Sequence, residues 1–295
     1  MDFKQIEAFV NVVRYKSFSK AADAMFFTQP TISTHVSNLE NELGVKLLDR
    51  KGRKIEMTQQ GSVFYKFAVD MVNAREQAVA AMDGVGEEVQ GILEIQTSSI
   101  PGIAFLPEVI AEFRKIHSGT KFYVTLSDTQ NVIDNLGERV GEIGFVGSRS
   151  NTASYEYTKL FSDRAVLMAP KSYNLGRKVS LDEILGLPFL WRESGSATRK
   201  SFEEAALALG HDKNDFDIAG LFNDIDSIVR SVEAGLGVSV ISKRTAEAIA
   251  NDKVDIIEIK DFNDKRDFYM VTLKNAALSP AAERFAEFVK EYIIK

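Results

Sequence analysis

The sequence predicts an α/β protein in which a mainly helical N-terminal unit precedes a larger domain of alternating strands and helices. Three observations support this prediction. Apolar residues recur at helical spacing through the first sixty residues, one periodic stretch continues from Thr58 towards residue 85, and strand-like runs alternate with helix-like runs from residue 91. The length of 295 residues favours two domains, and 45% hydrophobic with 26% charged residues excludes a disordered or fibrous chain.

Composition also excludes several kinds of site. The chain has no cysteine, so it contains no disulfide framework, thiolate metal site or cysteine redox switch. We expect no metal and no cofactor, because the three histidines are far apart in the sequence: His35, His117 and His211. No apolar run reaches roughly 18 residues, and the N-terminus lacks the basic region and unbroken apolar core of a signal peptide. We therefore expect a cytoplasmic protein with no membrane partner.

Charge is distributed unevenly along the chain. The net charge is −6, yet residues 1–60 contain 9 Lys and Arg against 7 Asp and Glu, while the remaining residues contain 27 against 35. Five of the basic residues lie between Lys46 and Lys54, where they could grip a phosphate backbone. A solvated basic hairpin is the alternative interpretation of this stretch.

The first sixty residues predict three helices. The first runs from Phe3 to about Tyr15, and Ser17 and Ser19 are candidate N-caps for a short second helix. The third helix has a cap at Thr28, a proline in its first turn and a terminating glycine at residue 44. Its buried stripe consists of Ile32, Val36, Leu39 and Leu43.

Two helices joined by a short turn, the second with small polar side chains at its start, are typical of a helix-turn-helix. In that motif the second helix enters the major groove, where such side chains exchange hydrogen bonds with base edges. The candidate DNA-contacting residues are Gln29, Pro30, Thr31, Ser33, Thr34 and His35. For His35, a solvent-facing side chain without a role is the alternative.

The segment from Phe3 to Gly61 resembles the winged helix-turn-helix of LysR-type bacterial transcriptional regulators. The resemblance rests on the ordered runs F-S-K-A-A-D-A, T-Q-P-T-I-S-T-H-V-S-N-L-E-N-E-L-G, L-L-D-R and M-T-Q-Q-G. It implies that Lys46–Thr58 forms the wing, with Arg50 and Arg53 near phosphate or the adjacent minor groove. Many relatives carry Gln where this chain has His35, so the bases that are read are left open.

Residues 59–90 predict a dimerising linker helix that ends in a hinge at the glycines of residues 84, 86 and 91. Apolar residues alternate at spacings of three and four, which is a coiled-coil pattern: Phe64, Phe67, Met71, Ala74, Ala78, Ala81 and Val85. The same stripe could instead pack on its own domain. The resemblance implies the antiparallel linker-helix dimer of the family, in which two reading helices engage palindromic half-sites. We expect no monomer at working concentration.

Residues 91–295 predict βαβ units and a mainly parallel sheet, in which ligands bind beyond the carboxyl ends of strands. Polar residues follow several predicted strands there: Thr97, Ser98, Ser99, Gly147, Ser148, Ser196, Thr198 and Asn223. The segment Arg192–Lys200 turns from strand into helix, so its hydroxyls and free N–H groups favour an anion. Arg199 either adds a positive charge or faces solvent, and Ser194 or Ser196 could simply cap a helix.

The C-terminal part resembles the effector-binding domain of LysR-type regulators, on the runs V-E-A-G-L-G-V-S-V-I-S and R-E-S-G-S-A-T-R. The resemblance implies a periplasmic-binding-protein-like domain with an effector between two subdomains, residues 91–162 with 266–295 and residues 163–265. Ser98, Ser99, Ser148 and Thr198 match positions that line its cleft, whereas Ile100 stands where relatives often have a hydroxyl. The second run is more like the branch concerned with sulfur and related anions, which implies a small oxyanion or carboxylate and a link to sulfur or selenium metabolism.

Together these features predict a DNA-binding transcriptional regulator with a DNA-binding domain (1–58), a linker helix and hinge (59–90) and an effector domain (91–295). The expected partners are double-stranded DNA with a palindromic promoter site, a small-molecule effector and further copies of the chain, as dimers that pair into tetramers through their effector domains. RNA polymerase is a further candidate.

An enzyme is the first alternative, but the strand ends offer hydroxyls without a histidine or paired carboxylates, so no residue is assigned a catalytic role. A solute-binding protein is the second, and the helix-turn-helix counts against it.

Overall fold

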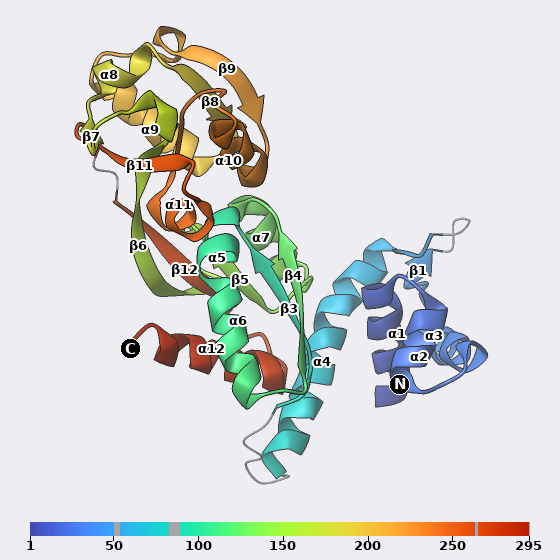
Figure 1. The fold of residues 1–295 in the computed structure, drawn as a ribbon. Helices are drawn as coiled ribbons and strands as arrows, with labels where there is room; N and C mark the ends of the chain where they lie inside the picture. The colour runs from blue at the N-terminus through green and yellow to red at the C-terminus, as the bar shows by residue number, and fades with distance from the viewer. Residues whose placement is uncertain (50–53, 83–88, 263–264, 295) are drawn as a thin grey trace.

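The structure is a computed structural model that describes residues 1–49, 54–82, 89–262 and 265–294. Its N-terminal unit packs three helices beside a two-stranded hairpin (Figure 1). Asp2 forms a capping box on the first helix, Ser17 rather than Ser19 caps the second, and Thr28 caps the third, which ends at Gly44 in the left-handed conformation. The elements are α1 (Phe3–Tyr15), α2 (Phe18–Met25), α3 (Gln29–Leu43), β1 (Leu48–Asp49) and β2 (Glu56–Met57).

A buried carboxylate fixes the start of the hairpin on the helices. Glu40, 5% exposed, accepts hydrogen bonds from the backbone N–H groups of Leu47 (2.9 Å) and Leu48 (3.2 Å) and from Lys46 Nζ (2.6 Å). Burial acts to raise the pKa of Glu40, but these hydrogen bonds outweigh it and hold the pKa below its usual value. The hairpin therefore leaves α3 in a defined direction.

The long helix α4 (Gln59–Met82) continues from the hairpin and packs back on the N-terminal core. Thr58 Oγ1 accepts from the N–H of Gly61 at 2.9 Å and so starts the helix. Gly61 lies so close to the preceding strand that a Cβ there would stand 2.0 Å from the Leu47 carbonyl oxygen, which only glycine avoids. The buried face of the helix consists of Gly61, Tyr65, Ala68, Val69, Val72 and Asn73.

The C-terminal domain is built on a curled eight-stranded sheet in the order β4-β3-β5-β12-β6-β11-β7, with β10 also paired to β6 and a separate β8-β9 pair. The strands are β3 (Gly91–Thr97), β4 (Thr120–Leu126), β5 (Ile143–Val146), β6 (Tyr155–Pro170), β7 (Lys178–Val179), β8 (Pro188–Arg192), β9 (Asp217–Phe222), β10 (Ser239–Ser242), β11 (Val254–Ile259) and β12 (Lys265–Leu273).

The sheet is mixed rather than mainly parallel, which corrects the sequence-based expectation. The pairs β3-β4, β3-β5, β7-β11 and β8-β9 are parallel, as expected of βαβ units. The strands β6 and β12 pair antiparallel with each other and with their other neighbours, because they cross between the two halves of the domain.

These two crossover strands join a first half, below in Figure 1, to a second half above it. The first half carries α5 (Ser99–Ala104), α6 (Leu106–Ile116) and α12 (Pro280–Tyr292) around a phenylalanine-rich core, and α7 (Thr129–Gly137) packs on a smaller separate cluster. The second half carries α8 (Leu181–Leu185), α9 (Ala197–Ala208), α10 (Ile225–Glu233), α11 (Lys243–Ile249) and the 3-10 turns Lys171–Tyr173 and Lys213–Asp215. Phe189, Trp191 and Phe202 lie in the core of this half.

Candidate functional site

The start of α3 is the exposed end of the helix-turn-helix. Gln29, Pro30 and Thr34 are exposed, and the Thr34 hydroxyl donates to the Pro30 carbonyl oxygen at 3.0 Å. The hydroxyl of Thr31 lies 2.8 Å from that of the cap Thr28. Small polar groups are thus held on the helix start by local hydrogen bonds.

The remaining residues predicted for this surface are half-buried. Ser33 and His35 lie along the same helix, and the His35 ring packs 5.8 Å from the Phe27 ring. His35 therefore does not stand free in solvent. Arg50 and Arg53 fall outside the described residues, and their predicted contacts stay a prediction.

The predicted seam of the linker helix is only partly exposed. Phe64 and Met71 pack at the edge of the N-terminal core, with the Phe64 ring 5.7 Å from that of Phe9. Phe67 is 60% exposed, and Ala74 and Ala78 are also exposed. The own-domain alternative thus accounts for two members of the seam. Ala81 is exposed as well, so these four residues leave an apolar strip uncovered among the described residues, and Val85 lies outside them.

The linker helix also contacts the first half of the C-terminal domain. Arg139 makes a two-pronged ion pair with Asp70, with Nε to Oδ1 at 3.1 Å and Nη2 to Oδ2 at 2.7 Å. Lys66 Nζ lies 3.0 Å from Glu138 Oε1. The long helix is therefore docked on the domain that follows it.

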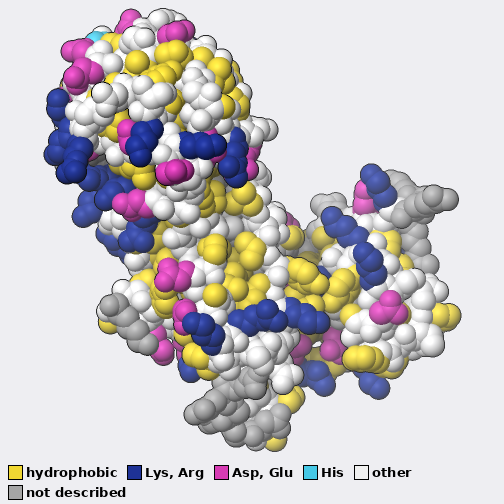
Figure 2. All heavy atoms as spheres, in the orientation of Figure 1, with side chains coloured by type: hydrophobic (Ala, Val, Ile, Leu, Met, Phe, Trp, Pro, Cys, Tyr) yellow, Lys and Arg dark blue, Asp and Glu magenta, His cyan; other side chains and the backbone are white. Residues whose placement is uncertain are grey.

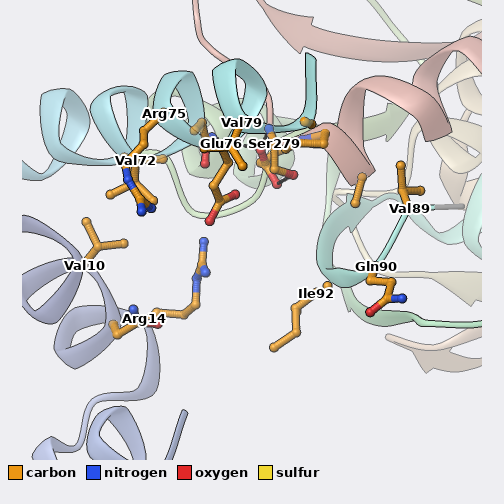
Figure 3. A pocket seen from close by; sticks show the side chains of 18 of the residues that line it. Val10, Arg14, Val72, Arg75, Glu76, Val79, Val89, Gln90, Ile92 and Ser279 are labelled. Carbon is orange, nitrogen blue, oxygen red and sulfur yellow. Dashed lines mark hydrogen bonds between the residues drawn. The ribbon is translucent and has the colours of Figure 1, made fainter. Parts of the chain in front are cut away.

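A hollow of about 670 Å³ lies where α1, α4 and the C-terminal domain meet (Figure 3). Arg14 points across it toward Glu76, and Arg14 Nε also lies 3.4 Å from Glu94 Oε1 of β3. Glu142, which also lines the hollow, accepts hydrogen bonds from the Ser279 N–H (2.6 Å) and hydroxyl (2.9 Å). Burial nevertheless raises the pKa values of Glu142 and Glu76 above the usual carboxyl value.

A cleft of about 590 Å³ lies between the two halves of the C-terminal domain. It brings together residues that are far apart in sequence and that were predicted as one site: Ser98, Ser99, Gly147, Ser148, Ser196, Thr198 and Asn223. Thr97 does not line it, which corrects the expectation for that residue. Thr97 is the last residue of β3, its side chain is buried, and its hydroxyl donates to the Ser98 carbonyl oxygen at 3.0 Å.

The start of α9 forms one wall of the cleft. Ser196 caps the helix through a 3.4 Å bond from the Arg199 N–H, so the capping interpretation holds for its side chain. Thr198 Oγ1 accepts from Arg266 Nη1 at 3.1 Å. Arg199 is not a cleft residue: its guanidinium lies over the Trp191 ring at 4.8 Å and donates to the Arg192 carbonyl oxygen at 2.7 Å.

Sequence reasoning missed several cleft residues. Arg266 lies inside the crossover strand β12 rather than after a strand. Arg192 also lines the cleft, and its Nε and Nη2 atoms each donate to a carboxylate oxygen of Glu193 at 2.8 Å. The start of α7 also lines the cleft, with Asp128, Thr129 and Gln130. The pattern of polar residues after β4 would have located this last group, since it follows the same strand-end rule.

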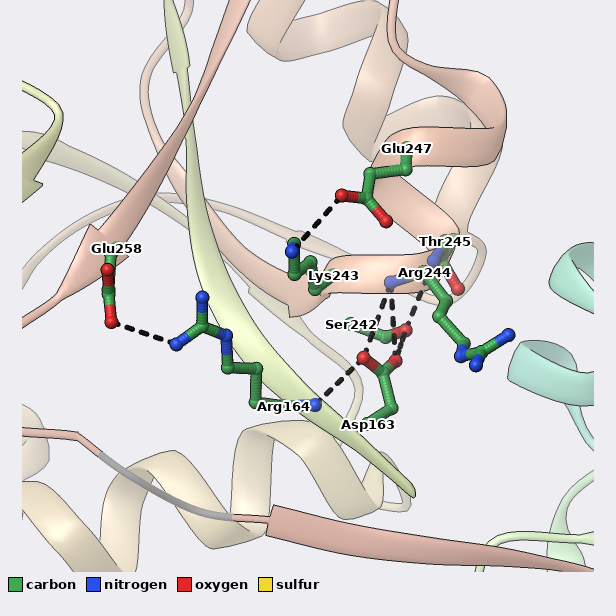
Figure 4. Close-up of polar contacts among 8 residues, drawn as sticks. All are labelled: Asp163, Arg164, Ser242, Lys243, Arg244, Thr245, Glu247 and Glu258. Atoms are coloured by element: carbon green, nitrogen blue, oxygen red, sulfur yellow. Dashed lines mark hydrogen bonds and ion pairs between the residues drawn. The ribbon is translucent and has the colours of Figure 1, made fainter. Parts of the chain in front are cut away.

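A polar cluster beside the cleft ties α11 to β6 (Figure 4). Asp163, a buried residue of β6, accepts a very short hydrogen bond from the Ser242 hydroxyl and a 3.3 Å bond from the Arg244 N–H. The Arg244 guanidinium lies 4.4 Å from the centre of the Phe161 ring. This cluster holds the second half on its crossover strand.

Within the described residues, no three His, Asp or Glu side chains are grouped as metal ligands. None of the described helices is long and apolar enough to cross a membrane.

Comparison with known proteins places both domains. The family model "Bacterial regulatory helix-turn-helix protein, lysR family" matches residues 3–62, and "LysR substrate binding domain" matches residues 86–293. An uncharacterized HTH-type transcriptional regulator of Methanocaldococcus jannaschii is 31% identical over 96% of this chain and 96% of its own. The regulator CysL of Bacillus subtilis is 28% identical over 90% of this chain and 89% of its own, and the activator CmpR of Synechocystis is 25% identical over 97% and 93%.

Solved structures show the same fold. A full-length OxyR variant from Pseudomonas aeruginosa covers 99% of this chain and 97% of its own with a TM-score of 0.78 at 17% identity. Full-length CbnR in complex with its target DNA covers 99% of each chain with a TM-score of 0.62 at 20% identity. The matched families and relatives are transcriptional regulators and not enzymes. The chain therefore belongs to the LysR family of transcriptional regulators.

Proposed function

We propose that this regulator binds palindromic promoter DNA as a dimer, in the cytoplasm, and that a small anion in the cleft between the two halves of its effector domain switches it. The observation that carries the anion is the Arg266–Thr198 contact of 3.1 Å. It places a permanent positive charge of one crossover strand against a hydroxyl at the start of α9.

The surroundings of this contact suit an oxyanion or carboxylate. Ser98, Ser99 and Ser148 line the opposite half of the cleft and supply hydroxyl donors. The cleft also includes the first turn of the twelve-residue helix α9, whose dipole favours negative charge. Arg192 also lines the cleft, where it pairs with Glu193.

A ligand that touches both halves favours the closed arrangement over the open one by its difference in affinity for the two. Both α9 and the Ser98–Ser99 segment would then contact the same molecule. The relatives include CysL, CmpR and regulators named for the RuBisCO operon, and these names give no single ligand, so we propose the anion class alone. The link to sulfur or selenium metabolism stays a prediction.

The exposed strip of α4 supports the dimer, because Phe67, Ala74 and Ala78 would be covered by a second linker helix. Two edge strands support further pairing into tetramers. Tyr123, Val124 and Leu126 of β4 are 46–59% exposed, and Leu221 of β9 is 67% exposed. Figure 2 shows hydrophobic side chains gathered over the region of β3 and β4. RNA polymerase stays a predicted partner.

In this proposal, DNA is contacted by side chains at the start of α3 and by the predicted wing residues Arg50 and Arg53. Those of α3 are Gln29, Pro30, Thr31, Ser33, Thr34 and His35. The phosphate contacts set affinity, and the helix selects the sequence.

A thermal-shift panel tests the anion. The compounds are sulfate, sulfite, thiosulfate, selenite, phosphate, acetate, citrate and O-acetylserine. A ligand at 100 times its dissociation constant stabilises the folded chain by about 2.7 kcal/mol. We expect a rise in Tm with one compound that Thr198→Ala abolishes and that Thr152→Ala, an exposed site outside the cleft, retains. A flat panel, or a rise that persists in Thr198→Ala, contradicts the proposal.

A further inference from the structure

The helix α7 touches both the cleft and the linker helix. Its start contributes Asp128, Thr129 and Gln130 to the wall of the cleft. Its other end contributes Glu138 and Arg139, which bind Lys66 and Asp70 of α4. Nine residues, or about 13 Å of helix, separate the two ends.

The contact at the linker end is specific. Arg139 is 12% exposed and Asp70 29% exposed, and their two parallel hydrogen bonds fix the guanidinium in one orientation. Arg139 also has a φ of 60°, in the left-handed region that residues other than glycine seldom adopt. The backbone is thus turned out of the helix at the residue that holds α4.

The apolar contact between α7 and the sheet is small. Val132, Ile133 and Leu136 of α7 form a small cluster with Val146 and Val271, and this cluster is separate from the larger core of the same half. A further tie is the hydrogen bond from Asn135 Nδ2 to Gln96 Oε1 at 3.0 Å. A helix with such a small packing contact can slide or tilt as a rigid unit, which is the shear motion of packed helices.

We propose that α7 couples the cleft to the DNA-binding unit, with Arg139 and Asp70 as positioning residues. A ligand that displaces the start of α7 moves its far end, and the ion pair transmits that movement to α4 and to the helix-turn-helix packed on it. This inference rests on the proposed effector function for its trigger, but the mechanical link itself needs no effector.

Other contacts between α4 and the effector domain do not reach the cleft. Gln77 Nε2 lies 3.2 Å from Glu283 Oε2 of α12, and α12 does not line the cleft. The contact of Gln77 is therefore a control for loss of docking that bypasses α7.

Distances between spin labels test the coupling in the full chain without any ligand. The chain has no cysteine, so Lys20→Cys at an exposed position of α2 and Glu112→Cys on α6, where the side chain is 43% exposed, give one label on each side of the contact. An excess of unlabelled chain removes distances between subunits. In the unmodified chain we expect a narrow distribution of label-to-label distances. Arg139→Asp should shift this distribution or at least double its width, and the additional change Asp70→Arg should restore it. Gln77→Ala leaves it unchanged.

The cleft end of α7 has a matched control. Asp128 caps α7 by accepting from the Asn131 N–H at 2.8 Å, and Asp224 caps α10, also nine residues long, from the Ser227 N–H at 2.9 Å. We expect Asp128→Ala to shift the α2–α6 distance and Asp224→Ala to leave it unchanged. Asn131→Ala, which removes only the 2.6 Å side-chain bond to Asp128, should give a smaller shift in the same direction.

Three results would overturn the coupling. They are a broad distance in the unmodified chain, an unchanged distance in Arg139→Asp, and equal responses to Asp128→Ala and Asp224→Ala. None of them depends on whether any anion binds, so failure of the effector proposal is seen separately in the thermal-shift panel.

Discussion

The Asn73 side chain of the linker helix donates to Glu142 of the effector domain at 3.0 Å, and the same amide nitrogen donates to the Ala277 carbonyl oxygen at 2.8 Å. Asn73 is 5% exposed, and the half-buried carboxyl group of Glu142 lies beside it at this junction. The docking of the two domains is therefore sensitive to the charge on Glu142.

We predict that the stability of this junction falls as the pH rises. Burial raises the pKa of Glu142 in the folded chain, so the folded state binds its proton more tightly than the unfolded state does. This contribution is fully present below the ordinary carboxyl pKa near 4.5 and is lost as the pH rises through the raised pKa. The free energy of unfolding in urea, measured across this pH range, should depend less on pH in Glu142→Gln than in the unmodified chain. In Glu283→Gln it should depend on pH as it does in the unmodified chain.

Removing the anchor of the wing should destabilise the DNA-binding unit. Glu40→Ala leaves the buried N–H groups of Leu47 and Leu48 without their acceptor, at a cost of about 1–3 kcal/mol for each. Glu42→Ala is the control, because Glu42 lies at an exposed position of the same helix and forms its ion pair with the N-terminus. Equal urea midpoints for the two variants would contradict the anchoring role.

The exposed strip of α4 predicts the effect of a charge on assembly. Phe67→Glu should produce a species with the mass of one chain in light scattering, because the glutamate would be buried between two linker helices. Leu207→Glu places the same charge on a 66% exposed leucine of α9 and should not change the mass. A dimer that survives Phe67→Glu would exclude this strip as its interface.

Substitutions at a base-reading residue and at a phosphate-binding residue should have different effects in DNA titrations. Gln29→Ala should change the preferred sequence and leave the dependence of binding on salt unaltered. Arg50→Ala should weaken binding to all sequences alike and reduce the salt slope by about one. If Gln29→Ala weakened every sequence equally, its assignment as a base-reading residue would be wrong.

The N-terminal helices could be predicted almost residue by residue, because their ends depend on local groups. Thr28 and Gly44 bound α3 in the structure as the sequence predicts. The polar cleft residues that follow strands were also predictable, since strand ends gather at one edge of a sheet. Arg266 was not, because its place in the cleft depends on which strands cross between the halves, and the direction of the Thr97 side chain depends on the pleat at the end of β3.

The face of the linker helix was predictable only in part. Its apolar residues cover more than one face, and periodicity alone does not assign a face to the chain's own core or to a partner. The core takes Tyr65, Ala68 and Val69, next to the predicted seam. The contact of Arg139 with Asp70 has no signal in the sequence, because it depends on how two domains dock.

The position of Trp191, on which Arg199 stacks, has a consequence for fluorescence measurements. Trp191 is the chain's single tryptophan, it is 3% exposed, and the residue after it, Arg192, lines the cleft. Its emission therefore comes from the second half of the effector domain alone, with no contribution from the DNA-binding unit. A titration followed by tryptophan fluorescence would record events at the cleft without any dye, and the same sample would report on bound DNA through a label on the oligonucleotide.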